Sequence, residues 1–418
     1  MAKAKMKQRV IGALLSTCLL LGVSPARAQG AGSGKEPVRI GVMAKFAQIN
    51  GAAIRDGAQL AADEINAAGG VDGRRIELVT YDDQGSASDA ILALQRAVRQ
   101  DHVQAMVGTF LSEIAIAMTP WAARLKVPYI VTGAGADQVG DLVHDHYPAY
   151  KYVFRSILPA SSTAQGVCAS VRDLAVGQLH ASSGVLMTED AAWTQSYDAL
   201  LKTCLPDGGL KLVDAVKVAT DTSDFTPIFQ SIEGTGAQVI VTGVGIIGDK
   251  PVVQWNNQQV PLPLLGYNAQ AGASAFWQQT SGATNGLVTF TAASEDAALT
   301  PKTVPFAKAY RARFNTTPAA HSFATYDAIY LLKDAIERDH SSDADAMVAA
   351  LEKTDYVGAS GRIVFQGPQD KLTHDMKFGE GYVAGVAVQW QNGRQVTVWP
   401  SNVATGKLVF PSFVKLSQ

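Results

Sequence analysis

The sequence predicts an α/β protein built from two doubly wound parallel-sheet units of similar size. Short apolar segments alternate with amphipathic segments of helical periodicity, the pattern of a parallel sheet covered by helices on both faces. The alternation breaks at residues 152–156 and then restarts. The chain has 418 residues, more than one hydrophobic core usually supports, so its length also indicates two units.

The first unit begins with a strand-like apolar run at 38–43 and a helix at 51–68. In that helix Ile54, Ala58 and Ile65 share one face, and the glycines that follow end it. The same order then repeats. We expect strands at 75–81, 105–108 and 127–131, with helices at 88–101 and from Ser112 onward.

The second unit follows the break in this rhythm. Near its end, residues 386–398 alternate around Asn392 and Gly393, and this dipeptide predicts a β-hairpin because both turn positions require a positive φ. The other expected elements are strands at 184–187, 237–242 and 262–265 and helices at 194–205, 303–314 and 324–339.

The N-terminus has the parts of a secretory signal peptide. Basic residues at 3–9 precede an apolar run at 10–23, and small residues stand at the two positions that signal peptidase reads. We predict a signal peptide at 1–28, cleavage before Gln29 and a flexible linker at 29–36. The apolar run is shorter than the roughly 20 residues that span a bilayer. Cys18 lies inside the run, a position that disfavours lipidation.

The mature chain is mildly acidic. Five of the 35 basic residues fall in the predicted signal peptide, which leaves 30 against 37 acidic residues and a net charge of −7. This balance argues against nucleic acid and anionic membranes as partners. Cys168 and Cys204 remain after cleavage, on helix-like segments that flank one predicted strand. An oxidising compartment favours a disulfide between them, and two separately buried thiols are the alternative.

One segment has the spacing of a dinucleotide-binding fingerprint. Gly243-Val-Gly-Ile-Ile-Gly248 follows a predicted strand, but after Asp249 no acidic residue occurs before Glu295. The fingerprint requires such a residue about 20 positions on, where it holds the ribose hydroxyls. We therefore expect no cofactor here, and interpret the glycines as a strand-to-helix turn near a ligand.

No set of residues typical of an enzyme emerges. The sequence has no G-x-S-x-G, H-E-x-x-H or C-x-x-C motif. His144-Asp145-His146 would need further ligands to hold a metal. Asp82 and Asp83 end a predicted strand before a helix, where N-capping and pairing with the helix dipole explain them. We expect neither catalysis nor a metal site.

Two segments suit a small ligand instead. Ser112 opens a helix just after the strand at 105–108, where a hydroxyl beside free backbone N–H groups suits a carboxylate. The alternative role for Ser112 is a plain N-cap. The loop at 132–136 follows the next strand, and its small residues allow close approach to the backbone. Parallel sheets bind ligands at this edge.

Three segments near the start of the mature chain resemble a known family. They are residues 46–50, the stretch Gly57-Ala-Gln-Leu-Ala-Ala-Asp-Glu-Ile-Asn-Ala-Ala-Gly-Gly-Val-Asp-Gly73 and then Tyr81-Asp-Asp-Gln-Gly85. They look like the start of a leucine/isoleucine/valine-type periplasmic binding protein, and 127–130, 153–155 and 399–407 continue the match over most of the mature chain. The resemblance implies a type I periplasmic binding fold, with two doubly wound lobes joined by a three-segment hinge around a ligand cleft. We assign 37–156 plus 288–364 to lobe 1 and 157–287 plus 365–418 to lobe 2.

The family's ligand-binding positions carry over only in part. In the family, a serine matching Ser112 and a small-residue loop matching Ala134 hold the α-carboxylate of the ligand. A threonine usually follows in that loop, where this chain has Ala136. An aromatic residue often found before the first helix matches Asn50, and an aromatic wall residue of the second lobe matches Trp193. The other candidate ligand-binding residues are Phe110, Gly135, Val244, Asn268 and His321.

The largest departure from the family is at Asn268. It matches the acidic residue that pairs with the α-ammonium of an amino acid, and a buried ammonium without such a partner costs several kcal/mol. The surrounding stretch, 251–294, has no Asp, Glu, Lys, Arg or His. Our hypothesis is a ligand that lacks a free α-ammonium: an aromatic or aliphatic carboxylate, or a neutral apolar compound.

These features predict a monomeric solute-binding protein of the periplasm that captures a small molecule by lobe closure and delivers it to ABC transporter permease subunits in the inner membrane. Two alternatives stay open within the fold. One is a ligand-sensing receptor that reports to a signalling partner, and the other is a conventional amino-acid binder. An enzyme that uses Ser112 as a nucleophile would need a base, and the sequence assigns none.

Overall fold

The computed structural model describes residues 35–416. The predicted signal peptide, the cleavage before Gln29 and most of the predicted linker lie outside the described residues. Within residues 35–416, every helix is too short or too polar to cross a membrane. The described part is a mixed α/β structure in two lobes, as the sequence predicts.

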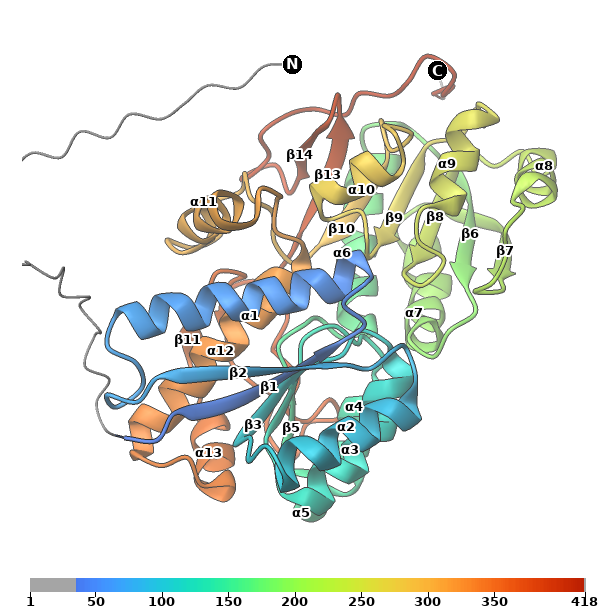
Figure 1. The fold of residues 1–418 in the computed structure, drawn as a ribbon. Helices are drawn as coiled ribbons and strands as arrows, with labels where there is room; N and C mark the ends of the chain where they lie inside the picture. Colours follow the sequence, from blue (N-terminus) through green and yellow to red (C-terminus); the bar gives the residue numbers. More distant parts are fainter. Residues whose placement is uncertain (1–34, 417–418) are drawn as a thin grey trace, which may run out of the picture. The chain divides into compact units, whose positions relative to one another are not determined.

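The first lobe is built on a five-stranded sheet in which all neighbours run parallel (Figure 1). Its strand order is β2-β1-β3-β4-β5, so the chain winds in both directions from β1. The strands are β1 (Val38–Ala44), β2 (Ile76–Asp82), β3 (Ala105–Gly108), β4 (Tyr129–Val131) and β5 (Val153–Arg155).

Helices cover both faces of this sheet because its buried side chains point alternately to either side. Val42 packs into the cluster that holds α1 and α12, whereas the adjacent Met43 packs against α2 and α3. One face carries α1 (Ile49–Ala67), α12 (Ala320–Asp339) and α13 (Ala344–Leu351). The other carries α2 (Ala87–Arg99), α3 (Ser112–Leu125), α4 (Gln138–Asp145) and α5 (Tyr147–Tyr150).

The second lobe repeats this design on a parallel sheet of order β7-β6-β8-β9. Leu186 of β6 packs toward α6 and α7, and its neighbour Met187 packs toward α8, α9 and α10. The strands are β6 (Ser183–Glu189), β7 (Lys211–Val218), β8 (Val239–Val244) and β9 (Leu264–Asn268). The helices are α6 (Ala160–Val171) with the π-helical turn η1 (Arg172–Val176), α7 (Thr194–Asp207), α8 (Thr226–Gly234), α9 (Lys250–Asn257) and α10 (Ser274–Gln279).

A three-stranded antiparallel sheet lies beside β9. It consists of β10 (Val288–Thr291), β13 (Val386–Gln391) and β14 (Arg394–Trp399), and the backbone N–H of Asn268 donates to Thr289 Oγ1 at 2.8 Å. The predicted hairpin forms, with φ of 49° at Asn392 and 84° at Gly393. The remaining elements are α11 (Thr303–Phe314), β11 (Tyr356–Val357) and β12 (Arg362–Ile363).

The division of the chain between the lobes at 156, 288 and 364 stays a prediction, and two pairings bear on it. β10, which begins at the predicted crossing at 288, pairs with β13 in one sheet. Asp375 forms a bridge with Arg155 of β5, so the segment just past residue 364 contacts the first sheet. These contacts favour a last crossing nearer to β13 than to residue 364.

Cys168 of α6 and Cys204 of α7 are joined by a disulfide, with their Cα atoms 6.0 Å apart. The two helices pack together on one face of the second sheet. The bond therefore fastens α6, which follows the first sheet in the chain, to the body of the second lobe.

Candidate functional site: a cavity between the two sheets

A small cavity of about 30 Å³ lies where both parallel sheets present the carboxyl ends of their strands. Its lining follows β3, β4 and β5 on one side and β6, β8 and β9 on the other. Parallel sheets bind ligands at this edge because every strand–helix connection there is a loop. The lining residues are Phe110, Leu111, Ser112, Gly133, Gly135, Ile157, Leu158, Ala160, Thr163, Trp193, Gly245, Ile246, Tyr267 and Ala269.

The first-lobe end of the cavity is the N-terminus of α3. Ser112 is the first residue of this helix, and the N-cap position belongs to Leu111, which makes no side-chain cap. The buried Ser112 Oγ accepts a hydrogen bond from the Ala136 N–H at 3.1 Å and keeps its own proton to donate. The N–H groups of Ser112 and Glu113 have no acceptor within residues 35–416. This end therefore offers donors and the positive end of a helix dipole.

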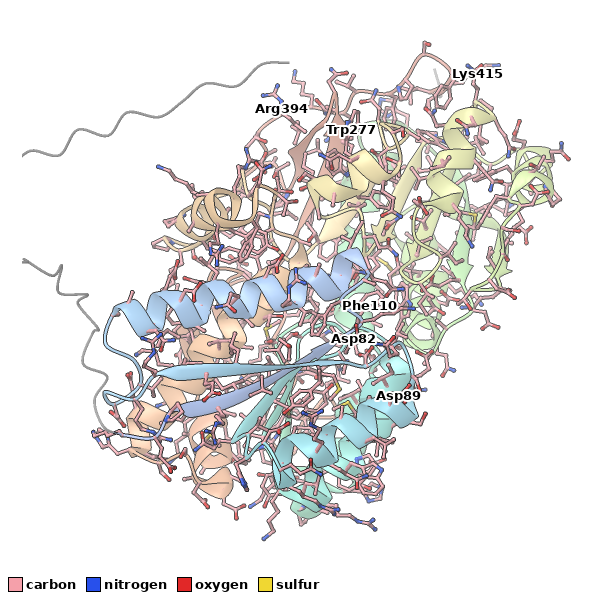
Figure 2. All side chains as sticks on the ribbon, viewed as in Figure 1. Asp82, Asp89, Phe110, Trp277, Arg394 and Lys415 are labelled. Atoms are coloured by element: carbon pink, nitrogen blue, oxygen red, sulfur yellow. A yellow bond between two sulfur atoms is a disulfide. The ribbon has the colours of Figure 1, made fainter. Side chains whose placement is uncertain are left out.

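The loop after β4 is held from behind by Arg155. Its guanidinium donates to the carbonyls of Ala134 at 3.3 Å and Ala136 at 2.6 Å, and it also pairs with Asp375. Arg155 is fully buried. Because the loop carbonyls turn toward Arg155, Gly135 can line the cavity with its backbone. Phe110, another residue of the lining, is labelled in Figure 2.

The second-lobe end of the cavity is aromatic. The rings of Trp193 and Tyr267 meet edge to face with centroids 5.5 Å apart, and Tyr197 packs behind Trp193 at 5.2 Å. The Tyr267 hydroxyl has no hydrogen bond to any of residues 35–416, and burial raises its pKa well above the usual range, with the nearby charge of Glu189 acting in the same direction. A neutral hydroxyl is therefore free to face a ligand.

The glycine-rich segment after β8 surrounds a carboxylate of the protein itself. Glu189, fully buried at the end of β6, accepts hydrogen bonds from the backbone N–H groups of Gly245 at 3.0 Å, Ile246 at 2.8 Å and Ile247 at 3.1 Å. These are the donors that a dinucleotide phosphate would need. The loop is thus occupied from within, which fits the interpretation of these glycines as a turn beside the ligand.

Hydrogen bonds connect the two sides beside the cavity, and the Ser161 N–H donates one of them to the Asp137 side chain at 3.1 Å. Glu113 of α3 accepts from the Ala192 N–H at 3.1 Å, and the Gln138 side chain donates to that of Gln195 at 2.9 Å. The Gly135 carbonyl accepts from the Ala160 N–H at 2.7 Å. The lobes are therefore in contact around the cavity.

Four of the predicted ligand-binding residues come together in the lining: Phe110, Ser112, Gly135 and Trp193. Ala134 and Ala136 are fully buried beside Gly135 and contribute backbone groups to the loop. The role of each of these residues toward a ligand stays a prediction.

The other predicted residues lie behind the walls. The Asn268 side chain accepts from the Gln270 N–H at 3.0 Å in the turn after β9, and its amide donates to the Gly248 carbonyl at 3.5 Å in the loop after β8. Val244 ends β8 in the core. His321 packs edge to face against Phe110, with ring centroids 5.3 Å apart. Burial lowers the pKa of His321 to about 4, a weak backbone contact with Gly133 opposing it. Neither His321 ring nitrogen nor Asn50 Oδ1 has a hydrogen bond of ordinary geometry within the described residues.

Sequence reasoning missed Glu189, Arg155 and the role of Tyr267. Tyr267 was within reach, since it adjoins Asn268 in the uncharged stretch. Arg155 belongs to a matched segment, but its partner Asp375 is 220 residues away. No local pattern marks Glu189, because its partners come from another strand–loop unit.

The acidic pair set aside from catalysis, Asp82 and Asp83, has a structural role. Asp82 accepts from the Gln84 N–H and Asp83 from the Gly85 N–H, both at 2.9 Å, whereas the N-cap of α2 is Ser86. Burial raises the pKa of Asp83. The two aspartates therefore shape the turn before α2 and do not cap the helix.

The comparisons with known proteins agree with this architecture. A sequence model of the periplasmic binding protein family matches residues 37–385. The chain is 26% identical over 420 residues to the Leu/Ile/Val-binding protein homolog 7 of Brucella suis biovar 1 (strain 1330), covering 96% of this chain and 98% of that one.

Two solved structures with the same fold hold different ligands. The branched-chain amino acid transporter substrate binding protein of Streptococcus pneumoniae, in complex with isoleucine, has a TM-score of 0.73 and 24% identity, covering 87% of this chain and 100% of that one. A solute binding protein of an ABC transporter from R. palustris, in complex with benzoate, has a TM-score of 0.74 and 17% identity, covering 90% and 99%.

The matched family model spans most of the chain, and the cavity lies at the edge where such lobes meet. The chain therefore belongs to the periplasmic binding protein family, whose members bind solutes and are not enzymes.

Proposed function

We propose that this protein is the periplasmic substrate-binding component of an ABC uptake transporter, and that its ligand is a small carboxylate without a free α-ammonium. The carboxylate is aromatic or aliphatic, and a neutral apolar compound is the alternative ligand. The observation that carries the proposal is the cavity lining, which has helix N-terminal donors at one end and aromatic rings at the other, with no charged side chain among the described residues that form it.

The carboxylate of the ligand would bind at the N-terminus of α3. The Ser112 hydroxyl and the unpaired N–H groups of Ser112 and Glu113 supply donors there. The dipole of this 14-residue helix adds a favourable interaction with negative charge.

The apolar body of the ligand would lie between Phe110, Trp193 and Tyr267. These rings offer edges and faces to an aromatic ligand, a contact worth about 0.5–1.5 kcal/mol beyond burial of the apolar surface. The free Tyr267 hydroxyl would bind a polar substituent at the far end of the ring.

A conventional amino acid is the second candidate, supported by the isoleucine complex of the streptococcal neighbour. It would require an acceptor for the α-ammonium, and Glu189, a buried carboxylate behind the cavity wall, is already surrounded by backbone N–H groups and the Trp193 indole. The matched position Asn268 is also engaged within its own loop. These contacts favour the ligand without an ammonium.

Family membership supports the transport role, and the monomeric state is part of the same proposal. A ligand that bridges both walls would favour the closed arrangement of the lobes. The protein would act as a monomer in the periplasm, and the permease subunits would recognise its closed form. A sensor would use the same closure, so a binding measurement alone does not distinguish a sensor from a transport receptor. Comparing ligand uptake by cells with and without the gene distinguishes them.

The test is thermal unfolding of the protein against benzoate, 4-hydroxybenzoate, benzamide, leucine and isoleucine. A ligand that binds only the folded state raises the midpoint as its concentration increases. We expect benzoate-like acids to raise it and leucine to have no effect at the same concentration. Strong stabilisation by leucine alone would refute the proposed ligand class.

A further inference from the structure

We infer that Glu189 is a positioning residue that sets the polarity of the cavity: it fills the anion-binding loop of the second lobe and so keeps the negatively charged end of a ligand at α3. The inference rests on the proposed function only in treating the cavity as the ligand site.

The Glu189 carboxylate joins Trp193 to the loop after β8, two parts of the second wall. Besides the three N–H groups of the loop, its Oε1 accepts from the Trp193 indole Nε1 at 2.7 Å. Trp193, Gly245 and Ile246 are at once partners of this carboxylate and lining residues of the cavity. The loop is also held from the other side, where the Gln270 amide donates to the Gly245 carbonyl at 2.9 Å. Glu189 is thus the common hydrogen-bond acceptor for donors from two separate loops, one after β6 and one after β8.

Without Glu189 this wall would attract anions. Three successive backbone N–H groups and an indole N–H converging on one point form an anion-binding nest. In the protein the nest is filled by a carboxylate that is itself fully buried. No Lys or Arg side chain hydrogen-bonds the Glu189 carboxylate within residues 35–416. The Lys217 ammonium donates instead to the Glu189 backbone carbonyl at 3.1 Å and to Thr194 Oγ1 at 2.7 Å, and it pairs with the Asp198 carboxylate.

The two ends of the cavity therefore differ in sign. At α3, unpaired N–H groups and the helix dipole favour an anion. Behind Trp193 and Tyr267, a buried negative charge with its donors already used disfavours one. A ligand with one carboxylate fits in one orientation only, and a ligand with a carboxylate at each end is rejected.

The first experiment needs no cavity ligand. Glu189→Ala empties the nest, and we expect its thermal midpoint to fall and sodium formate to raise it saturably, because formate replaces the missing carboxylate. Sodium chloride at equal ionic strength is the salt control. Wild type should show no formate-specific rise. Equal effects of formate and chloride on the variant would overturn the inference.

The second experiment compares benzoate with terephthalate, which carries a second carboxylate at the opposite end of the ring. We expect the preference of wild type for benzoate to drop by at least about tenfold in Glu189→Ala, with terephthalate gaining affinity. Formate should restore the preference by refilling the nest. An unchanged ratio of the two dissociation constants would overturn the inference.

Asp327→Ala is the matched control. Asp327 is also fully buried and accepts from two backbone N–H groups, those of Ala359 and Ser360, but does not line the cavity. Its variant should lose stability and keep the benzoate to terephthalate ratio. Should Glu189→Ala not fold, Glu189→Gln removes the charge and keeps an acceptor, and the same shift in ratio is expected. If wild type binds neither acid, the proposed ligand class fails, while the formate experiment still decides the role of Glu189.

Discussion

Arg155 and Asp375 form a fully buried, two-pronged ion pair across 220 residues of sequence, with Nε of the arginine 2.7 Å from Oδ1 of the aspartate. The same guanidinium holds the carbonyls of Ala134 and Ala136. The segment around Asp375 therefore supports the loop that lines the cavity at Gly135, and a contact far from the cavity in sequence determines its shape.

Breaking this pair should be costly. Arg155→Met leaves the Asp375 carboxylate buried without its partner, and we expect the free energy of unfolding to fall by about 3–5 kcal/mol. Urea denaturation at neutral pH measures the change. Arg362→Met is the matched control, because Arg362 pairs with Asp355 on the surface. Its urea midpoint should stay close to that of wild type, and equal losses in both variants would contradict the prediction.

Removing the Ser112 hydroxyl should weaken carboxylate binding selectively. A hydrogen bond to a charged group contributes about 1.5–3 kcal/mol, so Ser112→Ala should lose roughly ten- to hundredfold in benzoate affinity. Calorimetric titration provides the dissociation constants. Ser170→Ala, which removes a buried hydroxyl bonded to the Val167 carbonyl outside the cavity, serves as the control. A parallel loss in that variant, or none in Ser112→Ala, would speak against the α3 anion site.

Truncating Trp193 should remove most of the aromatic contact with the ligand. The indole is 9% exposed and lines the cavity, so Trp193→Ala should weaken benzoate binding by at least about tenfold. Trp121→Ala offers a comparison, since Trp121 stacks with Arg124 on α3 away from the lining. Benzoate affinity that survives in Trp193→Ala would place the ring of the ligand elsewhere.

The stability of the protein should fall in mild acid in part through His321. Its pKa is lowered from 6.5 to about 4 in the folded state, so the unfolded chain binds more protons between these values. The contribution of the neutral ring to folding stability is complete above pH 6.5 and is lost as the pH falls toward 4. Between pH 7 and pH 5 this loss amounts to about 2 kcal/mol.

The difference between wild type and His321→Gln isolates this effect. Burial raises the pKa of Asp375 to about 6, so protonation of Asp375 changes the stability with the opposite sign in the same pH range. Asp375 is present in both proteins, so its effect cancels in the difference. Denaturant unfolding at pH 7 and pH 5 should therefore show a weaker acid loss in His321→Gln than in wild type. The exposed His102, changed to Gln, should leave the wild-type pH dependence intact. Identical curves for all three proteins would exclude His321 as the cause.

Reducing the disulfide should destabilise the protein. Cys168 and Cys204 are 36 residues apart, a loop length for which cross-linking the unfolded chain contributes about 4 kcal/mol. The double variant Cys168→Ser, Cys204→Ser should unfold at a lower urea concentration than wild type. Adding a thiol reductant should shift wild type toward the variant and leave the variant unchanged. A reductant effect on the variant would point to another cause.

The elements with a strong local pattern were predictable. The helix at 303–314 agrees with α11, and the turn at Asn392 and Gly393 joins β13 and β14, because their periodicity and turn residues are local properties. The edge strand β7 was not predicted. Its burial follows no simple alternation, since Lys211, Asp214 and Ala215 are exposed on a strand with only one neighbour.

By itself the sequence determined the two-lobed parallel-sheet architecture through its apolar periodicity, and its motifs indicated the family. The loops at the strand ends also predicted the edge where we expect a ligand, because these features are local properties of the sequence. Only the tertiary structure decided what the walls of the cavity are made of. Glu189 reaches its three N–H donors through the packing of β6 beside β8, and Arg155 meets Asp375 only when the chain returns to the first sheet. Such contacts join segments that no local pattern relates, so their chemistry appears only once the chain is folded.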